Sequence, residues 1–153
     1  MIKETVIQDQ DKLLEIIKNS GQFDEDGLAY VEHTLEEHFP NPENALWYTA
    51  HDKTPVGVAY CTPEPMTSGT WNLLMLWVEQ GLEGKGFGSS LVAKIEEELK
   101  NKNARLLIVE TSGLDDFATA RSFYEKYGFK REAHIKNFFD EGDDKLVYTK
   151  SLT

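Results

Sequence analysis

The sequence predicts a single α/β (α+β) domain over residues 1–153, in which helices cover both faces of a mixed β-sheet. The length is typical of one domain and sufficient for a hydrophobic core. Strand-like stretches alternate along the chain with stretches that have the 3.6-residue period of helices. A glycine-rich loop also joins a continuous apolar run to a helical stretch, as expected where a buried strand leads into a helix.

The first third of the chain predicts one strand and two helices. Residues 1–7 form a short strand-like run. Residues 9–20 have leucines and isoleucines at helical spacing, and Gly21 follows as a helix-ending residue. An apolar stripe and an acidic first turn predict a second helix over residues 24–39, which Pro40 ends.

The middle of the chain predicts three strands and a helix. Residues 45–51 and 56–62 are rich in strand-forming residues and flank the turn sequence DKTP, which indicates an antiparallel hairpin. Residues 71–78 are apolar at nearly every position, as in a central strand buried on both faces. The glycine-rich loop spans residues 83–89, and the helix that follows it is expected to run to about Lys100.

The last third predicts three strands and a helix. Residues 105–111 are a second buried strand, and the helix that follows is expected to end at Gly128. Two final strands, 130–139 and 144–152, flank an acidic turn. The predicted order is therefore β-α-α-β-β-β-α-β-α-β-β.

The composition excludes several classes of protein. The formal net charge is −11, from 27 acidic and 16 basic residues, so binding to nucleic acid or to an anionic membrane is not expected. No apolar stretch approaches the ~20 residues of a membrane-spanning helix, and the N-terminal sequence lacks a signal-peptide pattern. Cys61 is the single cysteine, which indicates a reducing, cytoplasmic location. The four histidines are scattered, so no metal site is expected.

The most informative segment is the glycine-rich loop, EGKGFGS. Gly84, Gly86 and Gly88 let the backbone bend sharply and approach a ligand closely. The unpaired first amides of the following helix form an anion site, for which a phosphate or diphosphate is the natural occupant. A plain tight turn is the alternative. The spacing excludes the P-loop pattern, since Lys85 is followed by glycine, and the dinucleotide-binding pattern, since its third glycine is missing.

Two motifs together resemble the GNAT superfamily of acyl-CoA-dependent N-acetyltransferases. The run Glu83-Gly84-Lys85-Gly86-Phe87-Gly88 has the register of the family's central motif, which is Gln or Arg, two residues, Gly, one residue, then Gly or Ala. ARSFYEKYGF (120–129) is similar to the family's helix-to-strand signature. The resemblance implies a mostly antiparallel mixed sheet in which two adjacent parallel strands, here 71–78 and 105–111, splay apart.

The resemblance also implies acetyl-CoA as the co-substrate, bound in the gap between the splayed strands. Backbone groups of Trp77 and Val78 are expected to pair with the pantetheine arm as an added strand would. Phe117 and Ala120 are expected beside the cofactor, although Phe117 stands where many relatives carry an Asn. The loop residues expected to bind the diphosphate are Lys85, Gly86, Phe87, Gly88, Ser89 and Ser90.

For the chemistry, the resemblance implies direct attack of an amine on the thioester, with Tyr124 protonating the departing sulfur. A core aromatic residue is the alternative reading of Tyr124. Glu110, at the C-terminal end of its strand, is the expected general base. Glu79, His134 and a water chain are the other candidates.

The predicted function is therefore transfer of an acetyl group to a primary amine of a small molecule or peptide. Acidic residues around the 24–39 helix favour a cationic acceptor. A catalytically weak acyl-CoA-binding sensor or regulatory protein is the alternative, and the departures at Glu83 and Phe117 favour it. The sequence leaves open the identity of the acceptor and whether the protein forms a homodimer.

Overall fold

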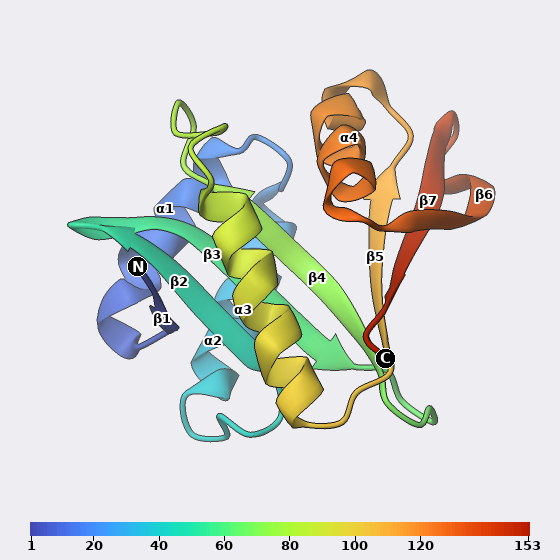
Figure 1. Cartoon of the computed structure of the whole chain (residues 1–153). Helices are drawn as coiled ribbons and strands as arrows, with labels where there is room; N and C mark the ends of the chain where they lie inside the picture. Colours follow the sequence, from blue (N-terminus) through green and yellow to red (C-terminus); the bar gives the residue numbers. More distant parts are fainter. The chain divides into compact units, whose positions relative to one another are not determined.

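The strands and helices follow the predicted order in the computed structural model, which describes residues 1–153 (Figure 1). The helices are α1 (Gln10–Asn19), α2 (Glu25–His38), α3 (Phe87–Asn101) and α4 (Ala118–Tyr127), with the short 3-10 helices η1 (Ile7–Asp9) and η2 (Asp115–Phe117). The strands are β1 (Ile2–Glu4), β2 (Leu46–Asp52), β3 (Thr54–Pro63), β4 (Thr70–Val78), β5 (Leu106–Ser112), β6 (Lys130–Asp140) and β7 (Asp143–Ser151).

The seven strands form one sheet in the order β1-β2-β3-β4-β5-β7-β6. Strands β4 and β5 are parallel, whereas the pairs β1–β2, β2–β3, β5–β7 and β6–β7 are antiparallel. Thr70–Leu73 pair with Leu106–Val109, and this register ends before either strand does. The predicted fold class, a mostly antiparallel mixed sheet with a splayed parallel pair, is confirmed.

The chain forms two compact units, which are described one at a time. Residues 1–62 and 75–98 make up the first unit, which contains α1, α2 and most of α3. Residues 63–74 and 99–153 make up the second, which contains α4 and the last three strands.

In the first unit, helices cover both faces of the sheet. Successive residues of a strand face opposite sides, and Trp47 and Tyr48 of β2 show this directly. Trp47 packs among apolar residues of α1 and α2, whereas the Tyr48 ring lies 5.7 Å from the ammonium group of Lys94 on α3. The buried residues around Trp47 are Leu13, Ile16, Ile17, Val31, Leu35 and Val58.

In the second unit, α4 is fixed at both ends. Near its start, Arg121 donates from Nη1 to the carbonyl oxygens of Ser112 and Leu114, both at 2.8 Å, and so ties the loop after β5 to the helix. At its end, Gly128 adopts a left-handed conformation with φ of 113° and closes the helix where the sequence predicts.

The N-terminal strand is shorter than predicted. It ends at Glu4, and the chain then turns into η1. The cause is local, because the Asp9 carboxylate accepts the backbone N–H of Val6 at 3.0 Å and so favours a helical turn over extended backbone.

Two predictions about the central strands are also wrong. The turn between β2 and β3 is only Lys53, whose φ of 69° makes a tighter reversal than the four-residue turn expected. Strand β4 is not buried on both faces throughout, since Leu74 is 51% exposed. Leu74 follows directly after Leu73, the last residue paired with β5.

Candidate active site

The glycine-rich loop gives α3 an open N-terminus. The first backbone hydrogen bond of the helix runs from the Ser90 N–H to the Gly86 carbonyl at 3.0 Å. The amides of Phe87, Gly88 and Ser89 therefore have no backbone acceptor. Free amides at the positive end of a helix dipole attract anions, and phosphate groups above all.

The backbone around these amides is reachable from outside. Gly84 and Gly86 have φ of 80° and 90°, which side-chain-bearing residues rarely adopt. A Cβ atom built on either glycine meets no heavy atom within 4 Å. The loop thus has the geometry of a phosphate-binding loop. Its free amides lie within the predicted binding segment, residues 85–90.

Glu83, the departure from the family pattern, is held within the loop. Its carboxylate accepts the backbone N–H of Gly81 at 2.7 Å. The hydrogen bond therefore stabilises the backbone turn just before the glycine-rich loop. Lys85 is exposed and provides a positive charge beside the free amides.

The end of β4 carries the residues predicted to pair with pantetheine. Trp77 is half-buried and contacts Phe23 edge-to-face, with ring centroids 5.8 Å apart. The N–H of Glu79 donates to the Val56 carbonyl of β3 at 2.7 Å. Because successive N–H groups of a strand point to opposite edges, the N–H of Val78 points away from β3.

Glu79, one of the alternative bases, has a structural partner. Its Oε1 lies 2.7 Å from Nζ of Lys12 on α1, and this hydrogen bond raises the pKa of the Lys12 ammonium group above its usual value. The pair links α1 to the segment after β4.

In the second unit, Tyr124 lies on α4 with its ring in the core and its hydroxyl unbonded. The residue is 7% exposed, and its ring lies 5.6 Å from that of Phe129 and 6.3 Å from that of Tyr148. No hydrogen bond within the chain involves the Tyr124 hydroxyl. Burial raises the pKa of Tyr124 above its ordinary value, so the group stays protonated at neutral pH and can donate a proton.

The helix brings two predicted neighbours toward the same side as Tyr124. Phe117 is the N-cap residue of α4, and Ala120 lies in its first turn; both are partly buried. With Tyr124 they are spaced i, i+3 and i+7, which places them along one helix face.

Glu110 is part of a polar network that the sequence did not reveal. Nδ2 of Asn72, a residue 2% exposed, donates to Oε1 of Glu110 and to Oε1 of Glu64, both at 2.8 Å. The other carboxylate oxygen of Glu110 forms an ion pair with Lys145 of β7. An amide and an ammonium group thus hold the predicted base in place at the strand end.

His134, the other alternative base, belongs to the β6–β7 hairpin. Its Nε2 lies 2.6 Å from Oδ2 of Asp144, while the N–H of Asn137 donates to Oδ1 of the same carboxylate at 2.9 Å. These contacts, the backbone one foremost, hold the pKa of Asp144 below its usual range. The structure therefore does not bring His134 into the Glu110 network.

No three histidine, cysteine, aspartate or glutamate side chains are grouped so that they could hold a metal ion. None of the helices combines the length and the hydropathy needed to cross a membrane.

Comparison with solved structures shows the same fold. A protein from Desulfovibrio desulfuricans, described as an acetyltransferase of the GNAT family, has a TM-score of 0.93 and 27% identity over 100% of this chain and 99% of its own. An aminoglycoside 6'-N-acetyltransferase complexed with coenzyme A has a TM-score of 0.82 and 19% identity, over 100% and 97%. Ribosomal-protein-alanine N-acetyltransferase from Brucella melitensis has a TM-score of 0.80 and 21% identity, over 99% of each chain. The last two, at this identity, establish the fold alone.

Sequence comparison identifies the family. No curated protein sequence matches the chain. The family model of GNAT acetyltransferases matches residues 11–129, a span that includes the glycine-rich loop and Tyr124. The chain therefore belongs to the GNAT acetyltransferase family.

Proposed function

We propose that this protein transfers an acetyl group from acetyl-CoA to a primary amine of a small molecule or peptide, by direct attack of the amine. The observation that carries the proposal is the row of free amides at Phe87, Gly88 and Ser89, in a loop whose glycines stand in open space. An acyl-CoA is a ligand with a diphosphate suited to these amides, and it supplies a thioester that is already activated toward amines.

The residues proposed to bind acetyl-CoA are those that the family resemblance implies. Backbone amides of residues 85–90 hold the diphosphate, with Lys85 adding charge. Backbone groups of Trp77 and Val78 pair with the pantetheine arm. Phe117 and Ala120 contact the arm through apolar surface, since neither side chain offers a hydrogen bond.

Tyr124 is the proposed general acid. As the C–S bond breaks, the Tyr124 hydroxyl donates its proton to the departing sulfur. Its raised pKa keeps the proton available, and its unbonded hydroxyl has no competing acceptor within the chain. The core-aromatic alternative accounts for the ring contacts, and the hydroxyl, which makes no hydrogen bond within the chain, is the group that the proposed acid role uses.

Glu110 is the proposed general base. It takes the proton that the amine nitrogen loses as the new C–N bond forms, while Asn72 and Lys145 keep the carboxylate oriented. Glu79, His134 and a water chain are the alternative bases: Glu79 is paired with Lys12, and Nε2 of His134 contacts Asp144.

The proposed acceptor is a cationic amine. The net charge of −11 and the acidic first turn of α2, Glu25 and Asp26, attract cations. Two structural neighbours are named as acetyltransferases of an aminoglycoside and of a ribosomal-protein alanine. We further propose that residues 1–153 act as one N-acetyltransferase domain in the cytoplasm, where the buried thiol of Cys61 stays reduced.

The test is release of free coenzyme A thiol from acetyl-CoA in the presence of a panel of amines, including aminoglycosides, polyamines and peptides with free N-termini. We expect thiol release that depends on at least one amine, together with an acetylated product by mass spectrometry. The alternative function, an acyl-CoA sensor, predicts acetyl-CoA binding by calorimetry without thiol release on any amine. Absence of both binding and release would exclude the two functions together.

A further inference from the structure

One primary amine of the chain already lies against the proposed general base. It is the ammonium group of Lys145 on β7, which forms an ion pair with Oε2 of Glu110. In the proposed reaction Glu110 takes a proton from the attacking nitrogen, so that nitrogen must reach the Glu110 carboxylate. Nζ of Lys145 meets this requirement in the folded chain.

Strand pairing fixes the position of Lys145 relative to Glu110. Lys145 pairs with Ser112 and Val147 pairs with Glu110, so Lys145 is a diagonal neighbour of Glu110 on the same face of the sheet. On its other edge β7 pairs with β6, where Ile135 is the partner of Lys145. Because the backbone of Lys145 is held between two strands, movement toward a substrate is left to its long side chain.

An aromatic ring completes the surroundings of the ammonium group. The centroid of the Phe138 ring on β6 lies 4.0 Å from Nζ of Lys145, which is a cation–π contact. The Lys145 side chain is only 15% exposed. This limited exposure restricts spontaneous reaction with acetyl-CoA in solution, so acetylation of Lys145 depends on a thioester bound beside Glu110.

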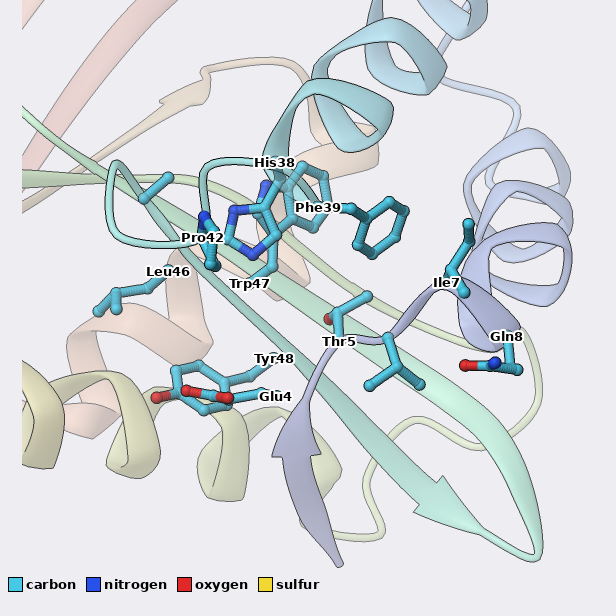
Figure 2. A pocket seen from close by; sticks show the side chains of 12 residues that line it. Glu4, Thr5, Ile7, Gln8, His38, Phe39, Pro42, Leu46, Trp47 and Tyr48 are labelled. Carbon is cyan, nitrogen blue, oxygen red and sulfur yellow. The ribbon is translucent and has the colours of Figure 1, made fainter.

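Other paired lysines lie against different carboxylates. Lys12 contacts Glu79, and Lys94 contacts Glu98. No lysine lines the cavity of about 340 Å³ that Figure 2 shows at the C-terminal end of α2 and the start of β2. Of these lysines, Lys145 is the one paired with the proposed base.

We infer that the protein acetylates its own Lys145, an inference that rests on the proposed acetyl transfer. The Lys145 ammonium group first loses a proton to solvent through Glu110. Its neutral nitrogen then attacks the thioester carbonyl of acetyl-CoA, so that a C–N bond forms and the C–S bond breaks. Glu110 takes the second proton from the nitrogen, Tyr124 gives its proton to the sulfur, and solvent returns a proton from Glu110 to Tyr124. The products are N-acetylated Lys145 and free coenzyme A.

The modification changes the surroundings of the base. Acetylation removes the positive charge of Lys145, so Glu110 loses its ion-pair partner and keeps the hydrogen bond from Asn72. The acetylated nitrogen is no longer a nucleophile, so the reaction stops after one turnover per chain.

The experiment mixes the full chain with acetyl-CoA carrying ¹³C in its acetyl group, with no added amine, and locates the label by mass spectrometry. We expect one label per chain, on Lys145, with a rate constant that does not change with protein concentration. Tyr124→Phe is expected to slow labelling by about 10²-fold or more, whereas Tyr30→Phe, at an exposed tyrosine, leaves the rate unchanged. Lys12 and Lys94, which are 29% and 28% exposed, are the matched internal controls and are expected to stay unlabelled.

Lys145→Arg keeps a positive charge and removes the primary amine. We expect this variant to lose the single equivalent of coenzyme A thiol that the wild type releases without an added amine.

The absence of label on Lys145 would overturn the inference. So would labelling that Tyr124→Phe leaves intact, which marks spontaneous chemistry, or a rate constant that rises with protein concentration, which marks transfer between chains. Thiol release with an added amine while Lys145 stays unlabelled would overturn this inference alone. Absence of both the label and any amine-dependent thiol release would count against the proposed acetyl transfer as well.

Discussion

At the scale of single residues, Tyr124 and Glu110 differ in how the fold holds them. The Tyr124 ring is packed among aromatic rings while its hydroxyl makes no hydrogen bond. The Glu110 carboxylate is instead contacted on both oxygens, by Asn72 and by Lys145. An unbonded hydroxyl suits a group that meets its partner only when substrate binds, and a clamped carboxylate suits one that must be oriented beforehand.

Tyr124→Phe removes only the hydroxyl, so the core packing of the ring is kept. We expect kcat to fall by roughly 10²- to 10⁴-fold, the usual contribution of a positioned acid, with acetyl-CoA affinity and thermal stability close to wild type. Steady-state kinetics, calorimetry and thermal unfolding measure the three quantities. Tyr30→Phe, at a residue 72% exposed on α2, is the matched control, and an equal loss in both variants would argue against a catalytic role.

Glu110→Gln keeps the acceptor that Asn72 uses and removes the charge. We expect kcat to fall by about 10²-fold or more, because the amide cannot take the proton from the amine. Glu64→Gln is the control, since Glu64 is the other carboxylate that accepts from Asn72. Unchanged kcat in Glu110→Gln between about pH 6 and 9 would assign the base to another group or to water.

The candidate site was predictable where it depends on local sequence. Gly84 and Gly86 predict the loop, and the helical spacing of Phe117 and Ala120 predicts that they share a face of α4 with Tyr124. The contacts that hold Glu110 were not predictable, because Asn72 and Lys145 lie on other strands and reach Glu110 through strand pairing that no local pattern encodes.

At the scale of elements, the loop before α3 combines strained backbone with open surroundings. The left-handed φ of Gly86 and the free amides that follow belong to one turn, so the geometry that exposes the amides also requires glycine. Replacing Gly86 by a residue with a side chain is therefore expected to have two separable effects, one on folding stability and one on ligand binding.

Gly86→Ala and Gly21→Ala separate these effects. Both glycines have left-handed φ, 90° and 73°, and neither has an atom within 4 Å of a built Cβ. We expect both variants to lose about 1–2 kcal/mol of unfolding free energy, from the conformational strain alone. Only Gly86→Ala is expected to weaken coenzyme A binding, by about tenfold or more, since the methyl group occupies space beside the diphosphate. Equal coenzyme A affinity by calorimetry would contradict the assignment of the loop.

The β6–β7 hairpin is a second element, and its stability is expected to depend on pH. Asp144 accepts from Asn137 and contacts His134, so its pKa is lower in the folded than in the unfolded chain. A carboxylate of this kind stabilises the fold above its unfolded pKa, about 3.9, and that contribution is lost as the pH falls through the folded pKa.

Asp144→Asn tests this directly. We expect the variant to melt below wild type near neutral pH, and the difference between the two melting temperatures to close as the pH falls below about 4. Thermal unfolding followed by circular dichroism across this range measures the difference. A gap that stays constant down to about pH 2 would show that the Asp144 charge does not stabilise the hairpin.

Element boundaries were predicted better for helices than for strands. Asp24, whose side chain accepts the N–H of Gly27, and Gly128 mark helix ends in the sequence itself. Strand ends depend on partners elsewhere in the chain. Leu74 is apolar and lies within an apolar run, yet it is half exposed, because the partner strand stops pairing one residue earlier.

At the scale of the whole molecule, strand order, family and charge give one consistent account. The order of elements and the single parallel pair match the fold of the family to which the chain belongs. The net charge of −11 favours a cationic acceptor over an anionic one. Acetyl transfer to such an acceptor requires first that the start of α3 bind the diphosphate.

Titration of the ¹⁵N-labelled protein with coenzyme A, followed through its backbone amide signals, tests that requirement most directly. We expect the largest shifts at the amides of residues 85–90, with saturation, and a weaker response of the same signals in Gly86→Ala. Coenzyme A that saturates the protein while these amides stay unmoved, with the largest shifts elsewhere, would contradict the account.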